Sequence, residues 1–182
     1  PIKEIYSDAL EADKRYEIDT LILATGFDAM TGALTSIDIS GRGGVKLKDQ
    51  WQSGAKSYLG IGISNFPNLF TITGPGSPSV LSNMMPSIEQ HVNWITDCIQ
   101  WMVDHDKDVI ESSEIAEDDW MVLVNEIADT TIFTDTKSWY NGSNIDNKAK
   151  AFLPFIGVPV YTELLEEVVS ENYKGFIFDK VN

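Results

Sequence analysis

The apolar residues of the chain recur at helical spacing in three segments. Two neighbouring apolar stripes between residues 84 and 103 predict a long helix that is largely buried. A second helix is expected over about 113–129, with Ser112 or Ser113 as its N-cap, and a third over about 161–171. The stripes of the first helix contain Ile88, Val92, Ile95, Ile99 and Met102 on one side and Trp94, Cys98 and Trp101 on the other.

Shorter apolar runs that are bounded by turn residues predict strands. Residues 1–6 and 16–23 are interpreted as two strands joined by a polar turn around 11–14. The run TLIL at 20–23 is apolar on both faces, which is typical of a strand buried inside a sheet. Strands and helices in this mixture indicate an α/β fold. Further short strands are expected near 37–39, 45–47, 69–73 and 175–178.

The composition limits the classes of partner. With 182 residues, 43% of them apolar, the chain is long enough for a domain-sized core. Its net charge of −15 argues against nucleic-acid binding, because phosphate contacts need clustered Lys and Arg. An acidic run over 104–119 is interpreted as a solvated loop and helix start, since its spacing differs from that of calcium loops. No metal is expected, because His91 and His105 have no second His or Cys at ligand spacing.

Cysteine content and hydropathy bear on the compartment. Cys98 is the single cysteine, so no disulfide can form within the chain, and a reducing, cytoplasmic compartment is expected. Its place in an apolar stripe favours a packing role. No apolar run approaches the roughly 20 residues that a membrane-spanning helix needs, so no membrane association is expected.

Two Gly-rich stretches are candidate sites. GRGG at 41–44 lacks the spacing of a dinucleotide fingerprint and is interpreted as a turn. GPGSPSVLSN at 74–83 leads into the first predicted helix, but it contains neither a G-x-S-x-G nucleophile turn nor a phosphate-loop pattern. Unpaired N–H groups around 83–85 and the helix dipole would favour an electron-rich group there. An ordinary connection between a strand and a helix explains the same pattern equally well.

Residues 130–160 show little helical periodicity and are predicted to form a long loop that is functional or mobile. The stretch WYNGSN at 139–144 places aromatic residues in this polar loop. Such residues either bind a ligand or pin the loop to the core, and the residues alone slightly favour the second role.

Taken together, several motifs resemble one family in their order and spacing. The chain resembles the C-terminal third of the flavin-dependent Baeyer–Villiger monooxygenases, of the phenylacetone and cyclohexanone monooxygenase type, over essentially its whole length. The motifs that carry the resemblance are DTLILATGFD at 19–28, GRGG at 41–44, FPNLF at 66–70, GPGSPS at 74–79, SNM at 82–84 and SWY at 138–140.

The resemblance implies an incomplete part of an α/β flavoprotein with two dinucleotide-binding domains, one for FAD and one for NADP. Residues 1–28 would end the NADP-domain segment and return to the FAD domain. Residues 29–182 would form the C-terminal part of the FAD domain, including the mobile loop 130–160. The family's Gly-rich fingerprints and catalytic arginine would belong to other parts of a larger protein. We therefore expect no catalytic residue here and no activity from the chain alone.

The resemblance also implies site residues. The expected cofactor-binding residues are Thr25, Gly26, Asn83, Met84, Trp139 and Asn144. Of these, Asn83 and Met84 would lie against the flavin ring, and Trp139 would belong to the loop that closes over NADP. After the Trp loop the family often has N-x-P-G-K, whereas this chain has NIDNK at 144–148, which changes the expected turn.

The substrate pocket would be lined by Ser79, Val80, Leu81 and Met84. Val80 stands where the phenylacetone-type enzyme has a smaller residue, which implies a differently shaped pocket. The implied reaction uses FAD, NADPH and O2 to insert one oxygen atom next to a ketone carbonyl, giving an ester or a lactone. An N- or S-oxidising flavin monooxygenase and a stand-alone acidic interaction module without flavin are alternatives. In the isolated chain, apolar surface on 84–103 and 16–23 is expected to be exposed and to cause self-association.

Overall fold

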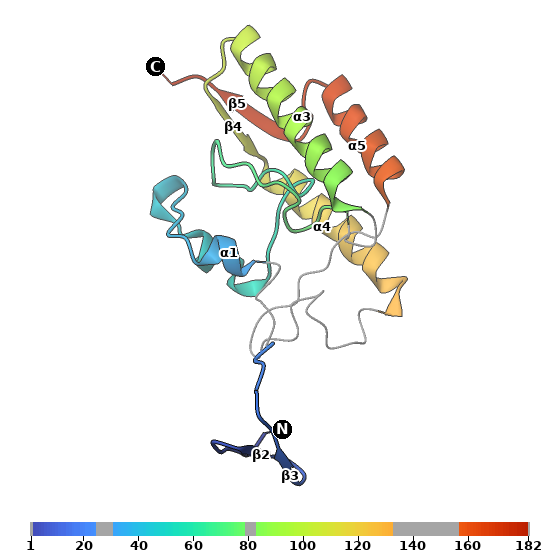
Figure 1. Ribbon diagram of the computed structural model, residues 1–182. Helices are drawn as coiled ribbons and strands as arrows, with labels where there is room; N and C mark the ends of the chain where they lie inside the picture. Colours follow the sequence, from blue (N-terminus) through green and yellow to red (C-terminus); the bar gives the residue numbers. More distant parts are fainter. Residues whose placement is uncertain (1, 25–30, 79–82, 133–156, 182) are drawn as a thin grey trace.

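A computed structural model describes residues 2–24, 31–78, 83–132 and 157–181 of the chain. Its largest part consists of three helices and a two-stranded antiparallel sheet, which lie side by side in Figure 1. The elements are α3 (Met84–Asp104), α4 (Glu114–Asp129), α5 (Val158–Ser170), β4 (Val109–Ser112) and β5 (Phe176–Asp179). The three predicted helices and the predicted last strand are thereby confirmed, with bounds that differ by a few residues.

Local capping explains where these helices begin. The side chain of Asn83 accepts a hydrogen bond from the N–H of Met85 at the start of α3. The Ser113 hydroxyl accepts one from the N–H of Ala116 at the start of α4, at 3.2 Å, which settles the cap on Ser113. Pro159 lies in the first turn of α5, where its missing N–H costs no helical hydrogen bond.

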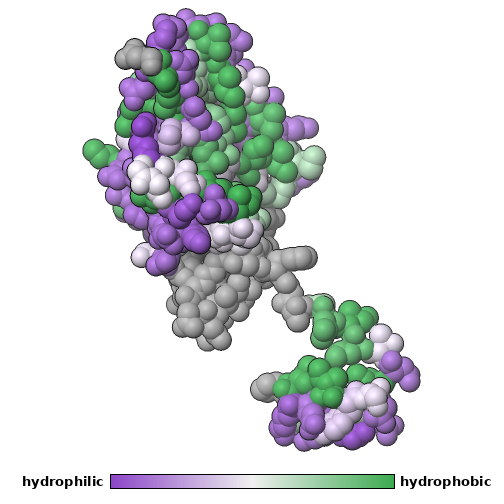
Figure 2. Space-filling view, turned by 90° about the vertical axis from the view of Figure 1, so that its left-hand side faces the viewer, coloured by the Kyte–Doolittle hydropathy of each residue, from purple (hydrophilic) through white to green (hydrophobic). Residues whose placement is uncertain are grey.

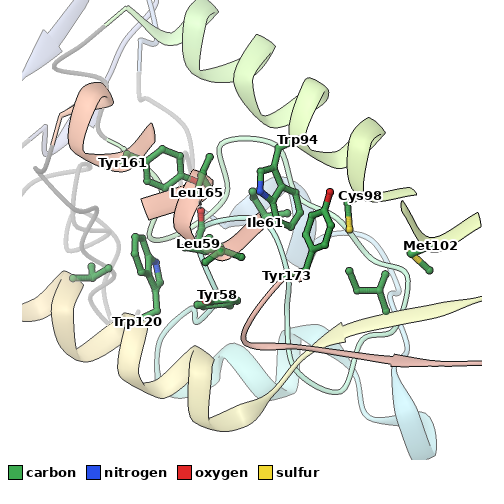
Figure 3. Packing of buried hydrophobic residues seen from close by; sticks show 13 residues of the cluster. Tyr58, Leu59, Ile61, Trp94, Cys98, Met102, Trp120, Tyr161, Leu165 and Tyr173 are labelled. Atoms are coloured by element: carbon green, nitrogen blue, oxygen red, sulfur yellow. Dashed lines mark hydrogen bonds between the residues drawn. The ribbon is translucent and has the colours of Figure 1, made fainter. Parts of the chain in front are cut away.

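The main hydrophobic core lies between the three helices and a tight turn over 58–62. Figure 3 shows Trp94 of α3, Trp120 of α4 and Tyr161 of α5 pointing towards this turn. A second, smaller core packs the segment 34–69 around Trp51 and Phe66. This segment contains short helices only, which are α1 (Gly32–Thr35), η1 (Arg42–Gly44), α2 (Leu47–Gln50) and η2 (Trp51–Ser53).

The strands predicted near 37–39, 45–47 and 69–73 are wrong. The first two are replaced by one isolated bridge, between Ser40 and Lys46, on either side of the Gly-rich turn that the sequence predicted. The third is reduced to a bridge between Gly62 and Phe70. Positive φ angles at Asn68 and Thr73 end the extended backbone on both sides of that bridge.

The first residues form a three-stranded antiparallel sheet, β1 (Glu4–Ile5), β2 (Ala9–Glu11) and β3 (Arg15–Glu17). This sheet lies apart from the helices in Figures 1 and 2. The predicted strand 16–23 is wrong beyond Glu17, and Ile22 and Leu23 are 81% and 69% exposed. Within the described part of the chain no strand pairs with 20–23, so the run that suits a sheet interior has no sheet around it.

The prediction that α3 is largely buried is also wrong. One stripe is buried, and it contains Ser87, His91, Trp94, Cys98 and Met102. Val92, Ile99 and Val103 on the other side are 42%, 47% and 67% exposed, because no described element packs on them. Figure 2 shows apolar residues reaching the surface of the helical part and of the N-terminal sheet. Among the described residues, no helix is long and apolar enough to span a bilayer.

Candidate functional site

The first half of the loop that precedes α3 is buried and tied to the turn over 58–62. The N–H of Gly74 donates to the Gly60 carbonyl at 3.1 Å, and the N–H of Thr71 donates to the Ile61 carbonyl at 2.8 Å. The two backbones approach so closely that a Cβ on Gly74 would lie 2.8 Å from the Gly60 oxygen and 2.4 Å from Thr71 Oγ1. Glycine is therefore required at position 74 by close packing.

The side chains of Ser57, next to the 58–62 turn, and of Trp120 in α4 hold the same segment. Ser57 Oγ donates to the Pro75 carbonyl at 2.5 Å, and Trp120 Nε1 donates to the Gly76 carbonyl at 3.1 Å. Ser77 is buried at 1% exposure, which removes it as an accessible nucleophile. Residues 74–78 thus form a clamped turn in which the carbonyl groups of Gly74, Pro75 and Gly76 all accept hydrogen bonds from inside the protein.

His91 and Tyr161 join this segment to two helices. His91 Nδ1 accepts from the N–H of Thr73 at 3.0 Å, and His91 Nε2 lies 2.8 Å from the Tyr161 hydroxyl. That hydroxyl donates its own proton to the Leu59 carbonyl, so His91 Nε2 carries a proton and donates to Tyr161. Burial lowers the pKa of His91 from 6.5 to about 4 and raises the pKa of Tyr161 well above 10. Both rings are therefore neutral at pH 7.

The N-terminus of α3 lies at the other end of the loop. Asn83 is exposed and Met84 is half-buried. The prediction of unpaired N–H groups around 83–85 is wrong for Met85, whose N–H is bound by the Asn83 side chain at 3.1 Å. Pro86 has no N–H, so Met84 keeps the one N–H of the first three helical positions that lacks a partner inside the helix. The first turn also contains no acidic residue to neutralise the helix dipole.

The structure therefore places Asn83 and Met84 at a helix N-terminus whose first turn contains no acidic residue to offset the positive end of the helix dipole. The other predicted site residues, which lie outside the described residues, are Thr25, Gly26, Ser79, Val80, Leu81, Trp139 and Asn144. Cys98 is buried, and burial raises its thiol pKa to about 12, which confirms a packing role.

One member of the acidic run is not solvated. Glu117 is 3% exposed and accepts from the Ser64 N–H at 2.8 Å and the Ser64 hydroxyl at 3.0 Å. Burial is the main cause that raises its pKa. The signal was present in the sequence, because Glu117 extends the buried stripe of Trp120 and Val124 backwards at helical spacing. Among the described residues, no group of His, Cys, Asp or Glu could hold a metal ion.

No family model matches the chain. Its sequence is nevertheless 37% identical to cyclohexanone 1,2-monooxygenase of an Acinetobacter species, over 97% of this chain and 33% of that protein. It is 38% identical to acetone monooxygenase (methyl acetate-forming) of a Gordonia species, over 97% of this chain and 34% of that protein. It is also 38% identical to phenazine N-monooxygenase of Lysobacter antibioticus, over 97% of this chain and 33% of that protein.

Solved structures agree with these relatives. The closed crystal structure of cyclohexanone monooxygenase matches the whole chain with a TM-score of 0.92 and 36% identity, over 34% of its own length. A steroid monooxygenase with bound NADP also matches the whole chain, with a TM-score of 0.87 and 38% identity, over 34% of its length.

These matches place the chain among the FAD-dependent monooxygenases. Within that class its sequence and fold match Baeyer–Villiger monooxygenases over nearly its whole length, as its motifs predicted. The chain spans about a third of the length of the curated relatives that it matches. Its α/β fold is accordingly one part of their larger architecture.

Proposed function

We propose that a protein containing this chain uses FAD, NADPH and O2 to insert one oxygen atom next to a ketone carbonyl, giving an ester or a lactone. The observation that carries the proposal is the match of the whole chain to cyclohexanone monooxygenase, with a TM-score of 0.92 at 36% identity. The name of a second relative, acetone monooxygenase (methyl acetate-forming), describes the same conversion of a ketone to an ester.

The N-terminus of α3 fits the edge of a flavin. The N–H of Met84, which has no partner inside α3, the helix dipole and the absence of acidic residues in the first turn all favour an electron-rich group. In the proposed enzyme Asn83 and Met84 lie against the ring, and Met84 also faces the substrate. FAD, when bound, supplies the oxygen-activating chemistry and NADPH supplies the electrons. The chain's own contribution is to hold the ring edge on a rigid, dry support, because residues 74–78 are buried.

The remaining assignments are supported by the resemblance of motifs. Thr25 and Gly26 close a nucleotide-binding segment, so that residues 1–28 return the chain to the FAD domain and 29–182 complete that domain. Ser79, Val80 and Leu81 form a wall of the ketone pocket. Trp139 and Asn144 belong to a loop over 130–160 that covers NADP.

The isolated 182-residue polypeptide is proposed to lack activity, because segment 74–84 supplies only one edge of a flavin site. We propose that it self-associates through its exposed apolar side chains, among them Ile22, Leu23, Val92, Ile99 and Val103. The net charge of −15 supports a function without nucleic acid, and the single cysteine supports a cytoplasmic location.

Oxidation at nitrogen is a second candidate, because one relative at 38% identity is a phenazine N-monooxygenase. Turnover of ketones and of nitrogen heterocycles by the complete protein distinguishes the two reactions.

The test is made on a protein of the relatives' length that contains this chain. We expect a yellow preparation with a flavin absorbance band, and NADPH consumption that rises when cyclic ketones are added. Met84→Gly is expected to change the preference among ketones with little change in thermal stability. A colourless protein without NADPH oxidase activity would favour the acidic interaction module, and turnover of phenazines alone would favour N-oxidation. The isolated 182 residues serve as the colourless control.

A further inference from the structure

Thr73, immediately before the clamped turn, has an unusual backbone conformation. Its φ angle is +50°, in the left-handed region that β-branched residues rarely adopt. Such strain persists only where the surroundings over-determine the conformation, and it is concentrated at functional sites. The question is which contacts keep Thr73 in this conformation and what they position.

The N–H of Thr73 is bound by His91, at 3.0 Å from Nδ1. His91 is fully buried, and its other nitrogen is fixed by the Tyr161 hydroxyl at 2.8 Å. The rings of these two residues stack, with centroids 5.6 Å apart. Tyr161 is itself fully buried and donates to the Leu59 carbonyl. The ring of His91 therefore has one possible orientation, in which Nδ1 faces Thr73.

Thr73 and Asn83 are both attached to the same helix, Thr73 through its hydrogen bond to His91 and Asn83 as the N-cap. The residue after Asn83 is the first of α3, and His91 lies two turns further along the same helix. The hydrogen bond between Thr73 and His91 attaches the backbone just before the clamped turn over 74–78 to α3. Because α3 is rigid over this distance, Thr73 and the N-terminus of the helix keep a constant separation. The same helix end carries Asn83 and Met84.

We propose that His91 and Tyr161 are positioning residues for the clamped turn over 74–78, holding it in register with the N-terminus of α3 so that the turn and the helix end meet the cofactor in one orientation. This inference rests on the proposed function, because the turn needs a cofactor to position against. His91 acts through Thr73, and Tyr161 acts through His91. Neither residue contributes a group to the reaction itself.

Two substitutions of the same residue separate positioning from general stability. The Asn side chain of His91→Asn keeps an acceptor near Nδ1 for the N–H of Thr73 and loses the donor to Tyr161. The Gln side chain of His91→Gln reaches towards Tyr161 and loses the acceptor for Thr73. Both remove one hydrogen bond and the ring. We expect kcat to fall about ten-fold in His91→Gln and to stay within about two-fold of wild type in His91→Asn.

The measurement uses the flavin-loaded protein of full length, and kcat is normalised to bound flavin. We also expect His91→Gln, and not His91→Asn, to shift the flavin absorbance maximum and to accelerate hydrogen exchange at the Thr73 amide. Equal kcat and identical flavin spectra in both variants, with only lowered Tm, would overturn the proposal and leave a structural role. A wild-type protein without flavin contradicts the proposed function instead, which is a different outcome.

If His91→Gln does not fold, Tyr161→Phe replaces it, because Phe keeps the ring and loses only the hydroxyl. We expect faster Thr73 exchange and a kcat lowered about three-fold in this variant. Wild-type exchange at Thr73 together with wild-type kcat in Tyr161→Phe would overturn the proposal independently.

Discussion

Segments 71–78 and 18–24 are both short and irregular, yet they differ in what surrounds them. The first donates hydrogen bonds to the 58–62 turn and to His91 of α3 and accepts one from Trp120 of α4, and residues 74–78 are buried. The second places Ile22 and Leu23 in solvent, at 81% and 69% exposure. The chain itself therefore supplies the hydrogen bonds that hold the first segment. Among the described residues, no element covers the apolar side chains of the second segment.

The same contrast separates two stripes on the surface of α3. Its stripe through His91, Trp94 and Cys98 is packed by this chain, and its stripe through Val92 and Ile99 is not. The chain spans about a third of its relatives' length. An exposed apolar stripe on a helix is the kind of surface that another part of a larger protein covers. Packed and unpacked surfaces should then respond differently to substitution.

The largest effect is expected at the clamp. Trp120→Ala removes a buried ring that is 5% exposed, together with its hydrogen bond to the Gly76 carbonyl. We expect a loss of about 3–5 kcal/mol in the free energy of unfolding, measured by urea titration of the isolated chain. Val122→Ala is the matched control on the exposed side of α4, at 56% exposure, and should change stability by less than about 0.5 kcal/mol. Equal losses in the two variants would contradict the clamped core.

A somewhat smaller effect is expected from pH. The pKa of His91 is about 4 in the folded chain and near its ordinary 6.5 when unfolded, so the unfolded state binds more protons between these values. Stability is therefore complete above pH 6.5 and falls as the pH drops towards 4, by about 3 kcal/mol for this group. Glu117 opposes this trend, because its raised pKa favours the folded state at low pH.

The contribution of His91 is isolated by comparing wild type with His91→Asn in urea titrations at pH 7 and pH 5. We expect the difference between the two proteins to shrink as the pH falls, because only wild type must keep an imidazole neutral. A difference that is independent of pH would show that His91 titrates normally in the folded chain. NMR titration of the His91 ring gives its pKa directly.

The smallest effect on stability is expected on the uncovered face. In a double variant, Val92→Lys and Ile99→Lys should each change the free energy of unfolding by less than about 0.5 kcal/mol. They should lower self-association of the isolated chain, measured by analytical ultracentrifugation, because each places a charge in an exposed apolar stripe. Val122→Lys adds the same charge on α4 and should leave association unchanged. A large loss of stability in the α3 variant would mean that this face is packed after all.

The helices could be predicted from the sequence because their signals are local. Asn83 and Ser113 cap their helices through bonds that span two or three residues, and both predicted starts are confirmed. The strand prediction over 20–23 was wrong because pairing depends on a distant partner, which the described chain lacks. The choice between the two stripes of α3 likewise depends on what packs against them.

The candidate site could be predicted only in part. The motif at 74–84 identified the segment, but its clamp uses Ser57, Trp120 and His91, which lie up to 44 residues away in sequence. Such contacts leave no local pattern. His91 in particular resembled an isolated histidine without partners, and its bond to Tyr161 joins residues 70 positions apart.

The most direct test of the account is the fate of molecular oxygen. A protein of the relatives' length that contains this chain is supplied with FAD, NADPH, a cyclic ketone and isotopically labelled O2, and the product is analysed by mass spectrometry. The account predicts a lactone that carries one labelled oxygen atom, and its loss when FAD is removed. A flavin-loaded protein that consumes NADPH but returns every ketone unlabelled and unchanged would contradict it.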